Sequence, residues 1–188
     1  MTAIVDPDVR ALAIHSATLR ADYGARASSW EGSPFAWIRT LPSASRGAVG
    51  AKLLSGWLAT KGFDVERSPD SQADRIVNGV RAEFKFSTLW EAGFYKFQQL
   101  RDQDYRFAVC LGLSPMDAHC WVIPKRAIFG PGKRAAGLIG QHGGAKGKET
   151  AWLTVAPEGV PEWLGAHGGR LAEAAKRIEA LTGRKRLK

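Results

Sequence analysis

The dipeptide Asn78-Gly79 is the feature that most constrains the fold of this chain. Asparagine and glycine both tolerate positive φ, and a two-residue hairpin turn of type I′ needs positive φ at both of its central positions. The sequence around the dipeptide therefore predicts a β-hairpin. Counting outward from the turn, Val77 lies opposite Val80 and Asp74 lies opposite Glu83.

This register brings two carboxylates together. Residues directly opposite each other on paired strands lie roughly 5 Å apart at Cβ, and like charges at that position destabilise a sheet. Lys85 follows Glu83 by two residues, so its side chain projects from the same face, while Phe84 and Phe86 alternate with them and point into the core. The arrangement of Asp74, Glu83 and Lys85 becomes favourable if a divalent metal ion lies between the acids.

Such a pair of acids suits phosphodiester chemistry. Mg²⁺ and Mn²⁺ bind carboxylate oxygens, retain waters and accept phosphate oxygens as further ligands. The backbone carbonyl of Phe84 adds a third oxygen ligand between the two acids. A metal ion held there can polarise a phosphodiester, lower the pKa of an attacking water and stabilise the leaving oxygen. The ammonium of Lys85 can orient that water or stabilise charge on the phosphorane.

The surrounding sequence predicts alternating helices and strands. Helices are expected over residues 7–23, 46–61, the second half of 90–104, and 169–182; strands are expected over 63–66, 106–113, 119–123 and 151–155, in addition to the hairpin. The stripe predicted to be buried on the helix over 46–61 consists of Val49, Leu53, Leu54, Trp57 and Leu58. From residue 46 onward the order is helix, three strands, helix and two strands, which indicates an α/β or α+β fold with a mixed central sheet flanked by helices.

The spacing of Asp74, eight residues and then Glu83-Phe84-Lys85 resembles the motif of the PD-(D/E)xK nuclease superfamily, which holds most type II restriction endonucleases. The core of that family runs helix, three strands, helix, strand, in agreement with the predicted order. The resemblance covers about residues 46–123, and the segment 97–105 also looks like restriction enzymes. It implies one nuclease domain over 1–188 with a restriction-endonuclease-like core, to which the helix over 7–23 and residues 124–188 are elaborations.

The resemblance also implies roles for the hairpin residues. Asp74 and Glu83 correspond to the metal ligands, with Mg²⁺ as the cofactor and Mn²⁺ as a possible substitute, and Lys85 corresponds to the catalytic lysine. One feature departs from the family pattern. Many members carry an acidic residue in the first core helix, whereas residues 46–61 contain Lys52 and Lys61 but no acid.

Two other acids are alternative ligands. Asp70 belongs to a literal Pro-Asp dipeptide, but in the hairpin register it falls opposite Ser87, beyond Glu83, so Asp74 is preferred. Glu66 on the preceding strand is a possible accessory ligand, although a solvated strand residue is the simpler interpretation.

The net charge of +9 favours a polyanionic partner, nucleic acid first, over a merely soluble basic protein. The segment Gly130–Lys148 holds seven glycines, four basic residues and no acid, and is expected to be a flexible loop around Leu138-Ile139. Its basic residues are candidate contacts to a phosphate backbone: Lys133, Arg134, Lys146 and Lys148.

Four further side chains are candidates for contacts with bases. Gln98 and Gln99 carry amides, which suit adenine edges, although a solvent-facing helix explains them equally well. Trp30 and Trp90 are the tryptophans expected to be available for stacking on bases.

The remaining features bound the location of the protein. The two cysteines, Cys110 and Cys120, are expected to be buried in neighbouring strands rather than to form a disulfide or a zinc site. No apolar run approaches the ~20 residues that cross a bilayer, and the first residues lack the pattern of a secretory signal. A cytoplasmic location without membrane attachment is the resulting expectation.

Taken together, these features predict a Mg²⁺-dependent endonuclease that hydrolyses phosphodiester bonds in double-stranded DNA. Cleavage of both strands needs two sites, so a homodimer is expected. The alternatives are a repair or recombination nuclease of the same fold and a catalytically silent DNA-binding module.

Overall fold

The computed structural model describes residues 13–14, 28–130, 135–141 and 150–183. Apart from Ala13 and Ile14, which are helical, the helix predicted over 7–23 lies outside these ranges. In the part of the chain that is described, no helix is both long enough and apolar enough to span a bilayer.

The described residues form short helices and nine strands in two sheets. The helices are η1 (Ser28–Trp30), α2 (Ala36–Arg39), α3 (Ser43–Thr60), α4 (Lys125–Phe129), α5 (Glu162–Gly165) and α6 (Leu171–Thr182). The strands are β1 (Val65–Arg67), β2 (Arg75–Val77), β3 (Val80–Thr88), β4 (Tyr95–Arg101), β5 (Phe107–Leu113), β6 (Ala118–Pro124), β7 (Leu138–Gln141), β8 (Thr150–Val155) and β9 (Gly168–Arg170).

The larger sheet is mixed, which agrees with the predicted α+β class. Its strand order is β1-β2-β3-β5-β6-β9, and the smaller sheet has the order β4-β8-β7. In the larger sheet β3 and β5 are parallel, whereas the other neighbouring strands are antiparallel. The expected strands over 106–113, 119–123 and 151–155 are confirmed as β5, β6 and β8, and the last expected helix is confirmed as α6.

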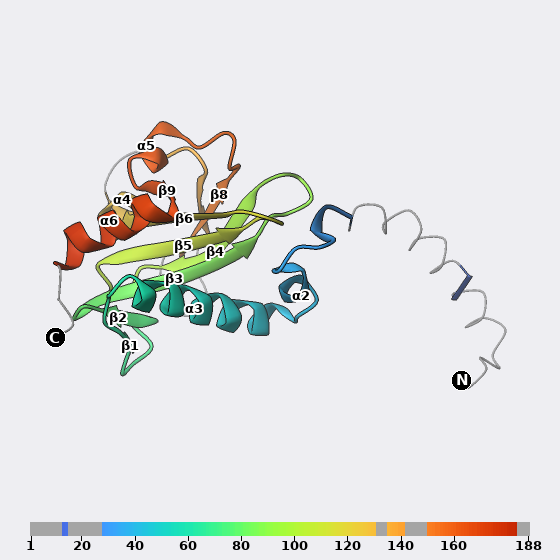
Figure 1. Cartoon of the computed structure of the whole chain (residues 1–188). Helices are drawn as coiled ribbons and strands as arrows, with labels where there is room; N and C mark the ends of the chain where they lie inside the picture. Colours follow the sequence, from blue (N-terminus) through green and yellow to red (C-terminus); the bar gives the residue numbers. More distant parts are fainter. Residues whose placement is uncertain (1–12, 15–27, 131–134, 142–149, 184–188) are drawn as a thin grey trace.

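Two apolar cores lie on opposite faces of the larger sheet. On one face α3 and α6 pack through side chains such as Leu58 and Ile178, and on the other face the smaller sheet packs together with α4 and α5 (Figure 1). Every residue of β5 is buried, because this central strand contributes alternate side chains to both cores. Cys110 and Cys120 are buried and free on the neighbouring strands β5 and β6, as predicted.

Helix α3 is seated directly on the hairpin strand β3. Leu54 and Leu58 face the core as predicted, but Leu53 is 38% exposed, so its assignment to the buried stripe is wrong. The helix approaches the sheet closely at Gly50, where an added Cβ would collide with the ring of Phe86. The helix ends at Thr60, and Gly62 at φ +82° then turns the chain toward β1.

The helix predicted in the second half of 90–104 is wrong, because this segment forms strand β4 of the smaller sheet. Phe97 and Leu100 are both buried at a spacing of three residues, which resembles one face of a helix. A β-bulge between them produces this spacing in a strand. Consequently a strand stands where the family resemblance implies the second core helix.

The predicted hairpin is confirmed as β2 and β3. Val77 pairs with Val80 and Arg75 with Ala82, and the turn residues Asn78 and Gly79 have φ values of +48° and +81°. The side chain of Asn78 accepts a hydrogen bond of 2.9 Å from the N–H of Asp64 and donates one of 2.9 Å to the carbonyl of Gly183. The turn is thereby tied to the start of β1 and to the end of α6.

Candidate active site

Asp74 lies at the point where the strand pairing of the hairpin ends. Its backbone N–H donates to the carbonyl of Ala82 over 3.1 Å, and its carboxylate Oδ2 accepts a hydrogen bond of 2.9 Å from the N–H of Phe84. The carboxylate therefore accepts the hydrogen bond that a backbone carbonyl would accept if β2 continued alongside β3. The predicted register is confirmed only as far as the pair Arg75 and Ala82. The backbone of Asp74 bonds to Ala82 instead of pairing with Glu83, and its side chain reaches the N–H of Phe84.

Glu83 is a carboxyl group at a buried position, with 4% of its surface exposed. Its Oε1 lies 2.7 Å from Nζ of Lys85. Burial raises the pKa of Glu83, the charge of Lys85 counteracts part of that rise, and the Asp74 carboxylate adds to it. The structure thus brings together Asp74, Glu83 and Lys85 at one edge of β3.

The carbonyl of Phe84 faces the same edge as Asp74. In an extended strand the N–H and C=O of one residue point to the same side, and the N–H of Phe84 points to Asp74. Among the described strands, none pairs with this side of β3 beyond Ala82. The carbonyl is therefore directed past the end of β2, where the two carboxyl groups lie.

These oxygens make a small set of hard ligands. The described residues contain no group of three or more His, Cys, Asp or Glu side chains suited to a metal ion. A metal ion at this edge would rest on the carboxylates of Asp74 and Glu83, the carbonyl of Phe84 and water. Mg²⁺ commonly binds in this way, with few protein ligands and several retained waters.

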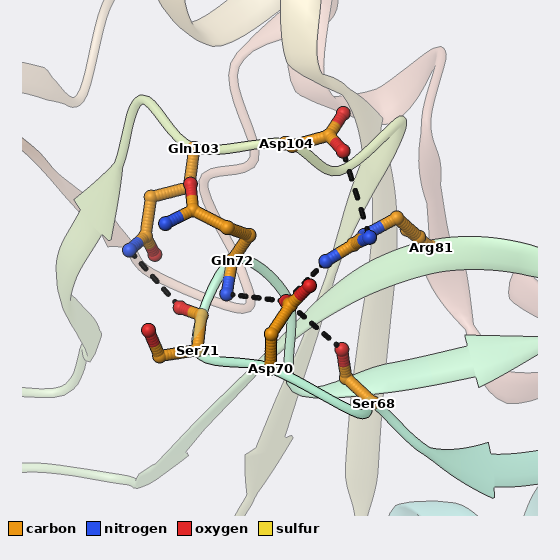
Figure 2. Close-up of polar contacts among 7 residues, drawn as sticks. All are labelled: Ser68, Asp70, Ser71, Gln72, Arg81, Gln103 and Asp104. Carbon is orange, nitrogen blue, oxygen red and sulfur yellow. Dashed lines mark hydrogen bonds and ion pairs between the residues drawn. The ribbon is translucent and has the colours of Figure 1, made fainter.

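Asp70 occupies a different environment from the one predicted. The chain turns at Ser68–Gln72 instead of extending the hairpin, so the register position opposite Ser87 is wrong. Asp70 forms an ion pair with Arg81 and accepts a hydrogen bond of 2.9 Å from the N–H of Gln72 (Figure 2). The hydrogen bond from Arg81 lowers the pKa of Asp70.

The contacts of Asp70 belong to a small network that fixes the loop beside the site. Arg81 also lies 3.6 Å from Asp104, and Nε2 of Gln103 donates a hydrogen bond of 3.1 Å to the carbonyl of Ser71. Figure 2 shows these contacts joining the loop before β2 to β3 and to the connection after β4. The geometry makes Asp70 an anchor for the segment that presents Asp74.

Glu66 lies on the edge strand β1, exposed and opposite Ile76. It lines neither of the two cavities beside the acids. The structure therefore favours the solvated strand residue over the accessory ligand.

Two cavities adjoin at the acids. One, of about 570 Å³, is lined by Asp74, Glu83 and Lys85. The other, of about 590 Å³, extends from Asp74 and Lys85 to β4 and the first turns of α3. Their linings contain five basic side chains, of which sequence reasoning identified one: Arg67, Arg75, Lys85, Lys96 and Arg101.

Two of the basic residues that the sequence did not reveal are firmly held. Arg75 donates to the carbonyl of Asp74 over 2.7 Å and to Oγ of Ser55 over 3.3 Å. Nζ of Lys96 lies 5.4 Å from the ring centre of Trp90 and 4.4 Å from that of Trp152. The position of Arg75 directly after Asp74 was the available signal for the first, whereas Lys96 joins the site only because its segment is a strand.

The predicted contacts to nucleic acid divide into three groups. Gln98 and Gln99 are exposed on β4 and line the second cavity. Lys133, Arg134, Lys146 and Lys148 lie outside the described residues. Trp90 is 46% exposed as expected, but Trp30 is only 5% exposed, so its predicted availability for stacking is wrong.

Comparison with models of known protein families gave no match, and comparison with curated proteins gave none either.

Proposed function

We propose that this chain is a metal-dependent endonuclease of restriction-enzyme type that hydrolyses phosphodiester bonds in double-stranded DNA. The observation that carries the proposal is the position of Asp74, whose carboxylate caps the N–H of Phe84 beside the buried Glu83. Asp74, Glu83 and the carbonyl of Phe84 are the proposed ligands of Mg²⁺, which Mn²⁺ can replace. The resemblance of this motif to PD-(D/E)xK nucleases supports the same assignment.

The residues at the site have separate roles in the proposed reaction. A bound Mg²⁺ supplies Lewis-acid activation of the phosphodiester and of a water molecule. Asp74 and Glu83 would hold the cation as ionised carboxylates, the form that binds a metal ion. Nζ of Lys85, which contacts Glu83 over 2.7 Å, can donate a hydrogen bond to the attacking water or to a non-bridging phosphate oxygen.

The basic lining of the cavities supports a polyanionic substrate. Arg67, Arg75, Lys96 and Arg101 come from four positions on β1, β2 and β4, and they surround the acids. Cations so placed can neutralise phosphates on either side of the one that is cleaved. Since a duplex has two strands to cut, we propose that two copies act together as a homodimer.

The second candidate is a module on this fold that binds DNA without cutting it. The ion pair between Lys85 and Glu83 favours this alternative, because each of the two charges has a partner within the chain. A third possibility is a repair or recombination nuclease, which would recognise DNA structure instead of sequence.

Plasmid cleavage with Mg²⁺ tests the proposal. Asp74→Asn, Glu83→Gln and Lys85→Ala are each expected to lower the cleavage rate by about 100-fold or more, the scale on which removal of one group that stabilises developing charge slows an enzyme. Glu66→Gln is the matched control, since Glu66 is an exposed acid on the neighbouring strand and is expected to leave the rate unchanged. Cleavage that survives all three site substitutions would overturn the site, and tight binding without cleavage would favour the silent module.

A further inference from the structure

Strand β4 presents two adjacent glutamines on the same side. Side chains normally alternate along a strand, and Tyr95 and Phe97 are buried on that pattern. Gln98 and Gln99, however, are both exposed, and the next buried residue is Leu100. The alternation is therefore interrupted at these two residues.

The interruption is a β-bulge with a defined geometry. Phe97 pairs with Leu153 and Leu100 with Ala151, so two residues of β4 stand opposite the single residue Trp152. Gln99 has φ +55°, in the left-handed region that residues with a side chain seldom adopt. Bulges redirect side chains and are frequent beside active sites. Here the bulge places both amides at the surface of the second cavity.

The neighbours of the two glutamines suit a bound duplex. Gln98 and Gln99 share their cavity with Asp74, Lys85 and Lys96. On the other side, Arg101 lines the cavity that holds Glu83, and its Nη2 donates a hydrogen bond of 3.4 Å to Oε1 of Gln99. Basic side chains thus flank the amides along β4, as expected where contacts to phosphates fix the register of a protein on DNA.

The two amides differ in their freedom to act. The amide of Gln99 is engaged by Arg101, whereas no described residue forms a hydrogen bond with the amide of Gln98. An amide offers a donor and an acceptor side by side, and this pair matches N6 and N7 of adenine in the major groove. Gln98 has the chemistry and the free hydrogen-bonding groups for that contact.

We propose that Gln98 reads one adenine in the major groove close to the cleaved phosphate, and that Gln99 is a positioning residue that maintains the bulge. This inference rests on the proposed function, because it assigns sequence recognition to the same site. It implies that the recognition sequence contains an A·T pair at a fixed distance from the cut.

The test is to cleave a library of duplexes with randomised sequence, in Mg²⁺, and to sequence the ends. The wild-type chain should prefer A·T at one fixed position by about 10-fold or more, the discrimination of one bidentate contact. Gln98→Ala and Gln98→Glu should abolish that preference while cleavage at other sequences continues. Glu66→Gln is the control, since Glu66 is an exposed residue of β1 that lines neither cavity, and it should keep the preference.

A selection of bound duplexes from the same library in Ca²⁺ separates this inference from the nuclease proposal. Enrichment of adenine that depends on Gln98 supports the reading role even if the chain does not cut in Mg²⁺, an outcome that overturns the nuclease alone. A preference that persists in Gln98→Ala, or wild-type selection with no adenine at a fixed position, overturns the inference. A loss of binding to all sequences equally would also contradict it, since Gln98 would then act as a backbone contact.

Discussion

Glu83 is a buried carboxyl group with one charged partner, Lys85. Its carboxyl group is removed from water, and Lys85 compensates only part of the resulting cost of ionisation. A divalent ion would supply the missing positive charge and bring the pKa of Glu83 down again. The same burial that disfavours the charged form in the free protein therefore makes a bound cation more effective.

The raised pKa of Glu83 predicts a stability effect with a defined sign. Protonation of Glu83 stabilises the folded state fully when the pH is below 4.5, the ordinary pKa of a glutamate side chain. This stabilisation is lost as the pH rises through the higher pKa of the folded state. Glu83→Gln keeps this position neutral, so in the absence of metal its Tm should exceed that of the wild type at pH 7, and the difference should disappear below pH 4.5. Calorimetry over this pH range measures it.

The response to metal provides the control for that experiment. Mg²⁺ should raise the Tm of the wild type, because a ligand that binds only the folded state stabilises it, and should have little effect on Glu83→Gln. A variant that is less stable than the wild type at pH 7 would show instead that the contact with Lys85 outweighs the cost of burial.

The elements around the site show which local sequence signals are sufficient to predict a strand and its pairing. The hairpin follows from Asn78-Gly79 because the turn type depends on two adjacent residues, and the pairing of Val77 with Val80 and of Arg75 with Ala82 follows from the turn. Strand β4 could not be recognised, because its bulge spaces Phe97 and Leu100 as a helix would. Lys96 and Arg101 were consequently missed, since their place beside the acids depends on tertiary pairing with β8.

The turn itself yields a prediction at this scale. Asn78→Ala should lower the free energy of unfolding by about 2–4 kcal/mol, because alanine is strained at positive φ and the hydrogen bonds to the N–H of Asp64 and the carbonyl of Gly183 are lost. Asn78→Gly tolerates the same φ and should recover about 1 kcal/mol of that loss. Urea denaturation of the two variants measures the difference, and equal stabilities would argue against strain at this turn.

At the scale of the whole molecule, part of the net charge of +9 can be assigned to the surroundings of the two cavities. The basic residues of β1, β2 and β4 line the two cavities at the acids, whereas no residue of α6 lines either of them. Composition indicated a polyanionic partner, but the assembly of these residues required the order of the strands, which no local pattern encodes.

This distribution of charge predicts the salt dependence of DNA binding. Arg101→Ala should weaken binding to all sequences alike and reduce the slope of log K against log salt concentration by about 1, as expected for the loss of one phosphate contact. Lys176→Ala, which removes an exposed charge from α6, should leave the slope unchanged. Titrations at several salt concentrations measure the slope, and equal effects of the two substitutions would show that only overall charge matters.

The hydrogen bond from the N–H of Phe84 to Asp74 has a consequence for the design of inactive variants. The carboxylate of Asp74 holds the end of the hairpin as well as being a proposed metal ligand. Its replacement by alanine would therefore remove this hydrogen bond and the proposed metal ligand at the same time. The side chain of Glu83 forms no hydrogen bond with the backbone of a described residue, so its conversion to glutamine leaves the contact between Asp74 and Phe84 in place. Glu83→Gln is therefore the better choice for an inactive variant that still binds DNA without cleaving it.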